Sequence, residues 1–198
     1  MEIIFAGQNK GKFFEFQQFF ENSEIKLNFV QEKVEVEEFG SSLRENAYIK
    51  ARNYYQLFKN STLADDSGLF VDKLGDQLGV ESANFGGKDL TDRSRCELLI
   101  EKMLPITKKE ERSAYFECCL CFYKNSKEIY FFQGRMQGSI AFQLGAGEGF
   151  GYDEVFIPLE NINPEEKTLA QLGVDWKNEH SHRKLAILSL KKFFSFTT

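Results

Sequence analysis

The chain has 198 residues, of which 42% are hydrophobic and 15% aromatic, and its formal net charge is −5. This length and composition support a substantial core and exclude an intrinsically disordered chain. The negative charge argues against a general nucleic-acid-binding protein, which needs a basic surface. A polyphosphate ligand would therefore have to meet a local cluster of Lys and Arg side chains.

The sequence shows no signal for a membrane or for secretion. No apolar run approaches the ~20 residues that span a bilayer, and the N-terminus lacks a basic segment followed by an apolar core. We therefore expect a cytoplasmic protein that acts away from membranes. Three of the four cysteines, Cys118, Cys119 and Cys121, crowd one predicted strand, which favours reduced thiols in the core because strand neighbours face opposite sides.

The first elements predict a strand, a polar loop and a helix. Residues 2–6 are typical of a short buried strand. Several Phe residues recur at helical spacing over residues 11–21 and predict an apolar helix face there. A loop that joins a strand end to a helix start is an arrangement that binds phosphate groups.

Residues 42–58 give the clearest helix signal. Ser42 and Glu45 have the spacing of a capping box, which satisfies the free N–H groups at a helix start. Lys50 falls within the apolar stripe of this helix. Two interpretations stay open for it: a snorkelling lysine, or a cation that faces a cleft.

Residues 62–70 carry the most unusual polar group of the chain. Asp65, Asp66, Ser67 and Gly68 interrupt a pattern that otherwise predicts a buried strand. Adjacent carboxylates with apolar flanks resist desolvation and so suggest a site for a cation or a proton. The alternative is ordinary turn chemistry, because Asp, Ser and Gly all favour turns.

The second half of the chain predicts a helix at residues 91–103 and a hairpin formed by residues 113–123 and 128–136. A Gly-rich loop at residues 145–151, a short strand at 154–157 and a closing helix at 181–194 follow. Alternating helices and strands with a long hairpin indicate an α/β protein with a mixed sheet, organised as a single domain over residues 1–198.

Four stretches, at residues 6–12, 62–70, 147–153 and 177–183, resemble in this order the motifs of the inosine triphosphate pyrophosphatase family. The resemblance implies an elongated mixed β-sheet flanked by helices, with two lobes and a central cleft. It implies Mg²⁺-dependent hydrolysis of non-standard purine nucleoside triphosphates (ITP, dITP and XTP) to the monophosphate and pyrophosphate, which cleanses the nucleotide pool. It also implies a homodimer.

The resemblance assigns roles to individual residues. Asp66 matches the catalytic carboxylate and, with Glu45, the Mg²⁺ ligands, although a capping role for Glu45 stays open. Asp65 is then a second ligand or a structural partner. Lys12 and Lys50 match catalytic cations that contact phosphate. The substrate-binding positions are Gly7, Gln8, Asn9, Lys10, Gly11, Lys12 and Ser67 for the triphosphate, and Phe150, Gly151, Tyr152, Asp153, Lys177, His182 and Arg183 for the purine.

Two departures from the family pattern matter. Gly7 and Gln8 replace the usual Thr-Gly or Ser-Gly, which removes a hydroxyl that would contact phosphate, although backbone amides can substitute. Glu154 replaces the usual Pro after Asp153, which should loosen that turn and add a charge near its rim.

The rival hypothesis is a non-catalytic nucleotide-binding or sensor protein. The carboxylates Asp66 and Glu45 are retained together with Lys12 and Lys50, and this set argues against the rival because binding alone would not need the carboxylates.

Overall fold

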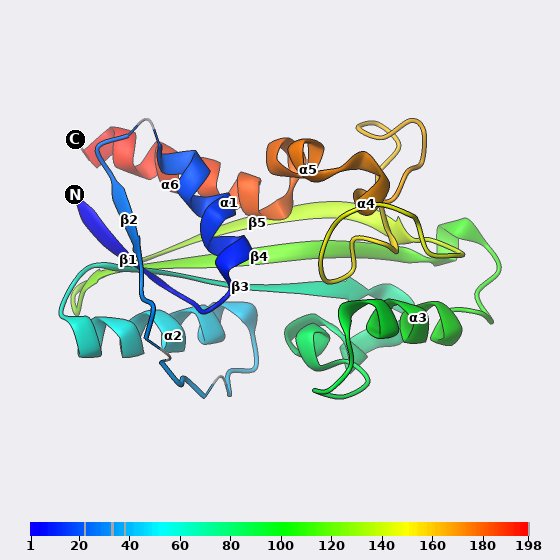
Figure 1. The fold of residues 1–198 in the computed structure, drawn as a ribbon, viewed down its shortest axis with the longest axis horizontal. Helices are drawn as coiled ribbons and strands as arrows, with labels where there is room; N and C mark the ends of the chain where they lie inside the picture. Colours follow the sequence, from blue (N-terminus) through cyan, green and yellow to red (C-terminus); the bar gives the residue numbers. More distant parts are fainter. Residues whose placement is uncertain (22, 33, 38, 198) are drawn as a thin grey trace. The chain divides into compact units, whose positions relative to one another are not determined.

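A computed structural model describes residues 1–21, 23–32, 34–37 and 39–197 (Figure 1). Its sheet has six strands in the order β2-β1-β3-β4-β5-β6. β1 runs parallel to β2 and β3, whereas β5 and β6 are antiparallel, which confirms the predicted mixed sheet. The strands are β1 (Glu2–Ala6), β2 (Lys26–Phe29), β3 (Thr62–Val71), β4 (Ser113–Asn125), β5 (Glu128–Ile140) and β6 (Phe156–Pro158).

The helices are α1 (Lys10–Phe20), α2 (Leu43–Phe58), α3 (Asp92–Lys102), α4 (Leu169–Leu172), α5 (Val174–His180) and α6 (His182–Thr197), with 3₁₀ turns at Asp72–Gln77, Gly79–Asn84 and Lys109–Glu111. The four longer helices, β1 and the hairpin confirm the sequence-based predictions. The local sequence patterns did not predict β2, α4 or α5. Among the residues that the structure describes, no helix has both the length and the apolar character to cross a membrane.

The chain divides into two compact units. The first unit contains Met1–Ser67, Cys118–Gly134 and Leu185–Thr198, and the second contains Gly68–Glu117 and Arg135–Lys184. The interpretation of these units as two lobes of one domain with a central cleft stays a prediction.

In the first unit, β1 shows how strand periodicity builds two cores. Ile3 and Phe5 pack with apolar residues of α1 and α6, whereas Ile4 and Ala6 pack with those of α2. Figure 1 accordingly shows α1 and α6 on one face of these strands and α2 on the other. Successive strand residues face opposite sides, so a strand covered on both faces is apolar at every core position.

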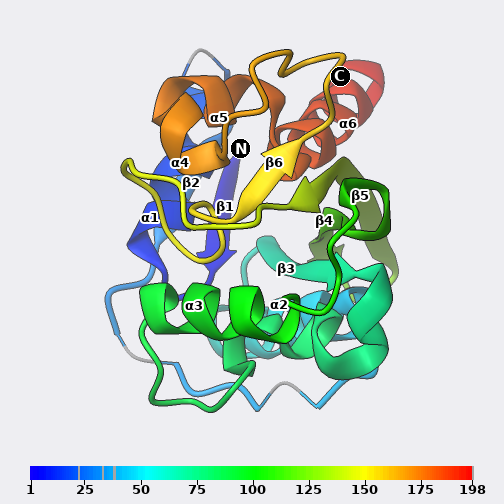
Figure 2. The same cartoon turned by 90° about the vertical axis from the view of Figure 1, so that its right-hand side faces the viewer.

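In the second unit, α3 lies on one side of the strands and α4 and α5 lie on the other (Figure 2). Its core includes Leu69, Leu99 and Phe156. Arg112 is fully buried in this unit and donates hydrogen bonds to the backbone carbonyls of Met103, Ile106, Ile140 and Ala141. A buried guanidinium needs such acceptors, and here it ties several loops and strand ends together.

The cysteines are packing residues. All four are buried. Burial raises the pKa of Cys96 and of Cys121 to about 12, so both are thiols at neutral pH.

The predicted interruption at Asp65–Gly68 is wrong. β3 runs without a break from Thr62 to Val71, so these residues belong to a strand and form no turn. Gly68 fits there because a Cβ atom at this position would lie 2.1 Å from the carbonyl oxygen of Gly79. The close backbone approach, and not a turn, explains this glycine.

Candidate active site

The parallel pairing of β1 and β3 places the loop after β1 beside the two carboxylates. Ala6 pairs with Ala64 in the sheet register. β1 ends at Ala6, and the chain continues as residues 7–9 into α1, while β3 continues directly into Asp65 and Asp66. Loops that leave the carboxyl ends of parallel strands gather at one edge, where α/β proteins bind ligands.

Asp65 and Asp66 face opposite sides of β3, and each has a lysine partner. The Lys12 Nζ atom of α1 lies 2.7 Å from Asp65 Oδ2, which also accepts a hydrogen bond from the Ser67 hydroxyl. The Lys50 Nζ atom of α2 lies 4.0 Å from Asp66 Oδ1 and donates to the Asp65 carbonyl. Strand alternation therefore separates the two carboxylates, and each of them pairs with a different lysine. We call Lys12, Lys50, Asp65 and Asp66 the lysine–aspartate cluster.

A cavity of about 170 Å³ opens beside this cluster in the first unit. Its lining includes the predicted residues Gly7, Gln8, Asn9, Lys12, Lys50 and Asp65. The lining also includes Tyr54, Val34 and Val36, which no sequence motif assigned to the site. Lys50 thus lines this cavity, and its contact with phosphate stays a prediction.

The loop residues have distinct local roles. The Asn9 side chain caps α1 by accepting a hydrogen bond from the Lys12 amide. Gln8 Nε2 donates to the Tyr54 hydroxyl and to the Glu32 carbonyl, each at 3.1 Å. Lys10 and Gly11 lie exposed in the first turn of α1.

Glu45 is engaged at the start of α2. Ser42 caps this helix as predicted, because its hydroxyl accepts from the Glu45 amide. The other half of the expected capping box is different: the Glu45 carboxylate accepts from the amide and hydroxyl of Ser41, not from Ser42. These hydrogen bonds, the backbone one first, lower the pKa of Glu45. Capping is therefore present, and a role of Glu45 in metal binding stays a prediction.

The second unit brings the purine-assigned residues together around Phe150. The Lys177 Nζ atom lies 2.6 Å from Asp153 Oδ2 and 3.8 Å from the centre of the Phe150 ring. The Arg183 guanidinium lies 5.2 Å from the same ring centre. The Asp153 carboxylate also accepts a hydrogen bond from the Phe150 amide, and this bond closes the turn. We call Phe150, Asp153, Lys177 and Arg183 the Phe150 cluster.

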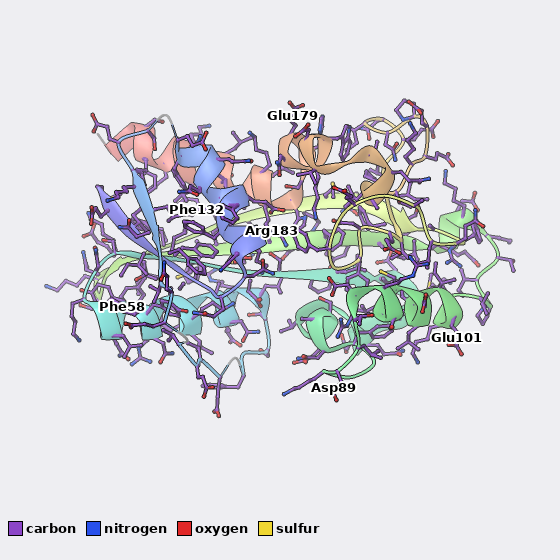
Figure 3. The ribbon with its side chains drawn as sticks, viewed as in Figure 1. Phe58, Asp89, Glu101, Phe132, Glu179 and Arg183 are labelled. Carbon is purple, nitrogen blue, oxygen red and sulfur yellow. The ribbon has the colours of Figure 1, made fainter. Side chains whose placement is uncertain are left out.

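His182 and Tyr152 are buried beside this cluster. His182 is the first residue of α6, at a helix start as predicted. Its ring stacks on the Phe116 ring, with 4.8 Å between the ring centres. The Tyr152 hydroxyl donates to the Ser82 carbonyl, and burial raises the pKa of Tyr152. By contrast, Glu179 on α5 is exposed and projects outward from the helix (Figure 3). The packing role of Phe116 had no signal in the sequence.

The fold and the lysine–aspartate cluster define a class: an α/β protein with a cationic strand-to-helix loop suited to an anionic ligand. The Ham1 family profile matches residues 3–193, and the chain belongs to this family. This confirms the resemblance drawn from the sequence motifs.

Relatives and solved structures extend this likeness over nearly the full length. A protein of Aquifex aeolicus named dITP/XTP pyrophosphatase is 38% identical, with 96% of this chain and 95% of the relative covered. One of the same name from Oceanobacillus iheyensis is 36% identical, with 97% of each covered. The structure of a HAM1 protein from Coxiella burnetii superposes with a TM-score of 0.89 at 33% identity, covering 98% of each chain.

Proposed function

We propose that this chain is a nucleoside triphosphate pyrophosphatase that hydrolyses the non-standard purine nucleotides ITP, dITP and XTP to the monophosphate and pyrophosphate. The observation that carries the proposal is the lysine–aspartate cluster beside the cavity, in a chain of the Ham1 family. The relatives named dITP/XTP pyrophosphatase support the substrate class.

The loop and the two lysines would bind the triphosphate. Lys12 and Lys50 reach the cavity from α1 and α2, and their charges would oppose those of phosphate oxygens. The amides at the start of α1 add donors for an anion. Attack of water on the α-phosphorus would break its bond to the bridging oxygen and release pyrophosphate, while Asp66 would accept a proton from that water.

The proposal includes a Mg²⁺ cofactor. Within the described part of the chain, no group of three or more His, Cys, Asp or Glu side chains is arranged to hold a metal ion. Mg²⁺ commonly uses only one or two carboxylates and completes its shell with water and substrate phosphates. Asp66 and Glu45 supply such oxygens and would hold the ion. When bound, Mg²⁺ would neutralise phosphate charge and acidify water.

The Phe150 cluster would bind the base. Phe150 offers an aromatic face, and Lys177, Arg183 and His182 offer donors for a 6-oxo purine. Adenine carries an amino group at that position and would leave those donors unsatisfied, so ATP should be a poor substrate.

A substrate panel tests the proposal. Pyrophosphate release should be fast with ITP, dITP and XTP in the presence of Mg²⁺, slower with ATP by a factor of up to ~10⁴, and lost after addition of a chelator. Nucleotide binding without any release of pyrophosphate would favour the rival sensor function. Sedimentation of the purified protein would test the predicted homodimer, and the cytoplasmic location also stays a prediction.

A further inference from the structure

The first two turns of α3 hold the turn at residues 150–154 at three points, all within the second unit. Asp92 Oδ2 accepts a hydrogen bond from the Gly151 amide at 2.7 Å. Cys96 Sγ donates to the Gly151 carbonyl at 3.2 Å. Arg93 Nη1 donates to Glu154 Oε2 at 3.3 Å. Both polar groups of Gly151 are therefore bound by side chains of one helix.

Helical spacing explains why one helix can do this. Residues four apart lie on one face, so Asp92 and Cys96 both face Gly151. Gly151 has a φ of +63°, in the left-handed region that favours glycine. Burial, followed by the nearby carboxylates of Glu154 and Asp92, raises the pKa of Cys96 to about 12, so its thiol keeps the proton that it donates.

The start of α3 is itself fixed. Thr91 caps the helix by accepting from the Ser94 amide. The buried Arg95 donates to the carbonyls of Phe85 and Gly87. The helix end that holds Gly151 is thus anchored independently of the turn that it contacts.

Glu154 gains a different role from the one expected. Replacement of the usual Pro by Glu154 should loosen the turn, but the Glu154 carboxylate is paired with Arg93. In this chain an ion pair to α3 restrains the turn where the family has a proline ring.

We propose that Asp92, Arg93 and Cys96 are positioning residues that fix the turn carrying Phe150, and so set the affinity for the purine base. This inference rests on the proposed function. It predicts that loss of these contacts weakens binding of the base and leaves binding of the triphosphate unchanged, since the phosphate-assigned residues lie in the first unit.

Paired variants test the inference. Asp92→Ala should raise KM for ITP by about tenfold, the worth of one hydrogen bond, with kcat nearly unchanged, whereas Asp92→Asn keeps an acceptor and should restore most of the affinity. Cys96→Ala and Cys96→Ser test the bond to the Gly151 carbonyl in the same way, because Ala removes the donor and Ser keeps one. Glu101→Gln is the matched control, because Glu101 is an exposed carboxylate of the same helix at the end opposite Asp92 (Figure 3). The inhibition constant of inorganic tripolyphosphate, which has no base, should stay at the wild-type value throughout.

Amide hydrogen exchange at residues 149–154 gives a readout that does not need turnover. Exchange at Gly151 should be faster in Asp92→Ala than in wild type and near wild type in Asp92→Asn. Unchanged exchange, or an equal weakening of ITP and tripolyphosphate binding, would overturn the positioning role. If wild type releases no pyrophosphate from any nucleotide, the proposed function fails, and the exchange data still decide whether α3 holds the turn.

Discussion

The lysine–aspartate cluster and the Phe150 cluster both pair lysine with aspartate, but at different depths. In the lysine–aspartate cluster Asp65 is 3% exposed, but the side chains of Lys12, Lys50 and Asp66 are 20%, 12% and 14% exposed, and Lys12 and Lys50 line a cavity. In the Phe150 cluster, Lys177 and Asp153 are 7% and 4% exposed. A partly hydrated charge can act on an incoming ligand, whereas a buried pair is bound to its own partner and mainly fixes geometry.

The two clusters also differ in where their hydrogen-bonding partners come from. In the first, the cations come from two helices, α1 and α2, on opposite faces of β3. In the Phe150 cluster, the Asp153 carboxylate accepts hydrogen bonds from both the Lys177 ammonium group and the Phe150 amide. We therefore expect substitutions in the first cluster to change turnover, and substitutions in the second to change selectivity together with stability.

The largest expected effect is at the two neighbouring carboxylates. Asp66→Asn should lower kcat by about 1000-fold, because it removes the proposed base and metal ligand, with the thermal midpoint within error of wild type. Asp65→Asn should instead lower the free energy of unfolding by about 2 kcal/mol through the weakened Lys12 bond. Kinetics and thermal unfolding of both variants check this. Comparable turnover of Asp66→Asn and wild type would remove Asp66 from the mechanism.

His182→Ala should act on selectivity and stability together. The ring is 1% exposed and stacked on Phe116, so its removal leaves a cavity that costs about 2 kcal/mol of unfolding free energy. The rate with ITP should fall more than the rate with ATP, because the proposed donor to the 6-oxo group is lost. Equal losses on both nucleotides, measured on protein shown to be folded, would leave His182 with a packing role alone.

Glu45→Gln separates capping from metal binding. A metal role predicts a rise of about tenfold in the Mg²⁺ concentration for half-maximal rate. A capping role predicts that Glu45→Gln has a lower thermal midpoint than wild type at neutral pH. The Ser41 hydrogen bonds lower the pKa of Glu45 below its usual 4.5, so their stabilisation is present above that pH and is lost as pH falls through the folded-state pKa.

Thermal midpoints of wild type and Glu45→Gln from pH 7 to pH 3 measure this second effect. The two curves should converge at the acid end. A constant offset over the whole range would show that charge on Glu45 does not contribute, and an unchanged Mg²⁺ requirement would leave the residue with capping alone.

The smallest effect is expected at Gly7. Gly7→Ser restores the hydroxyl of the family pattern and should lower KM for ITP by a few-fold, up to roughly tenfold for one hydrogen bond. The single change is preferable to a double one with Gln8→Gly, because Gln8 binds Tyr54 and Glu32. A Cβ atom at Gly7 would lie 3.0 Å from the Phe5 ring, so a rise in KM would indicate that this contact shifts the loop.

Much of the fold follows from local sequence patterns. The Ser42 cap and the apolar stripe predicted α2 closely, and two segments rich in Phe, Tyr, Cys and Ile predicted the hairpin of β4 and β5. Such signals work because capping and side-chain periodicity act within a few residues. β2 has only four residues, and α4 and α5 are short, so their local signals are weak and their pairing and packing in the tertiary structure define them.

The sequence by itself determined the fold class, the family and most residues of the two clusters, because their motifs are short and local. Only the tertiary structure decided what Asp65 and Asp66 do. Along the chain they are adjacent like charges, which predicted a break in the strand. In space, strand alternation sends them to opposite faces, where Lys12 and Lys50 compensate the charges, and β3 therefore continues through both.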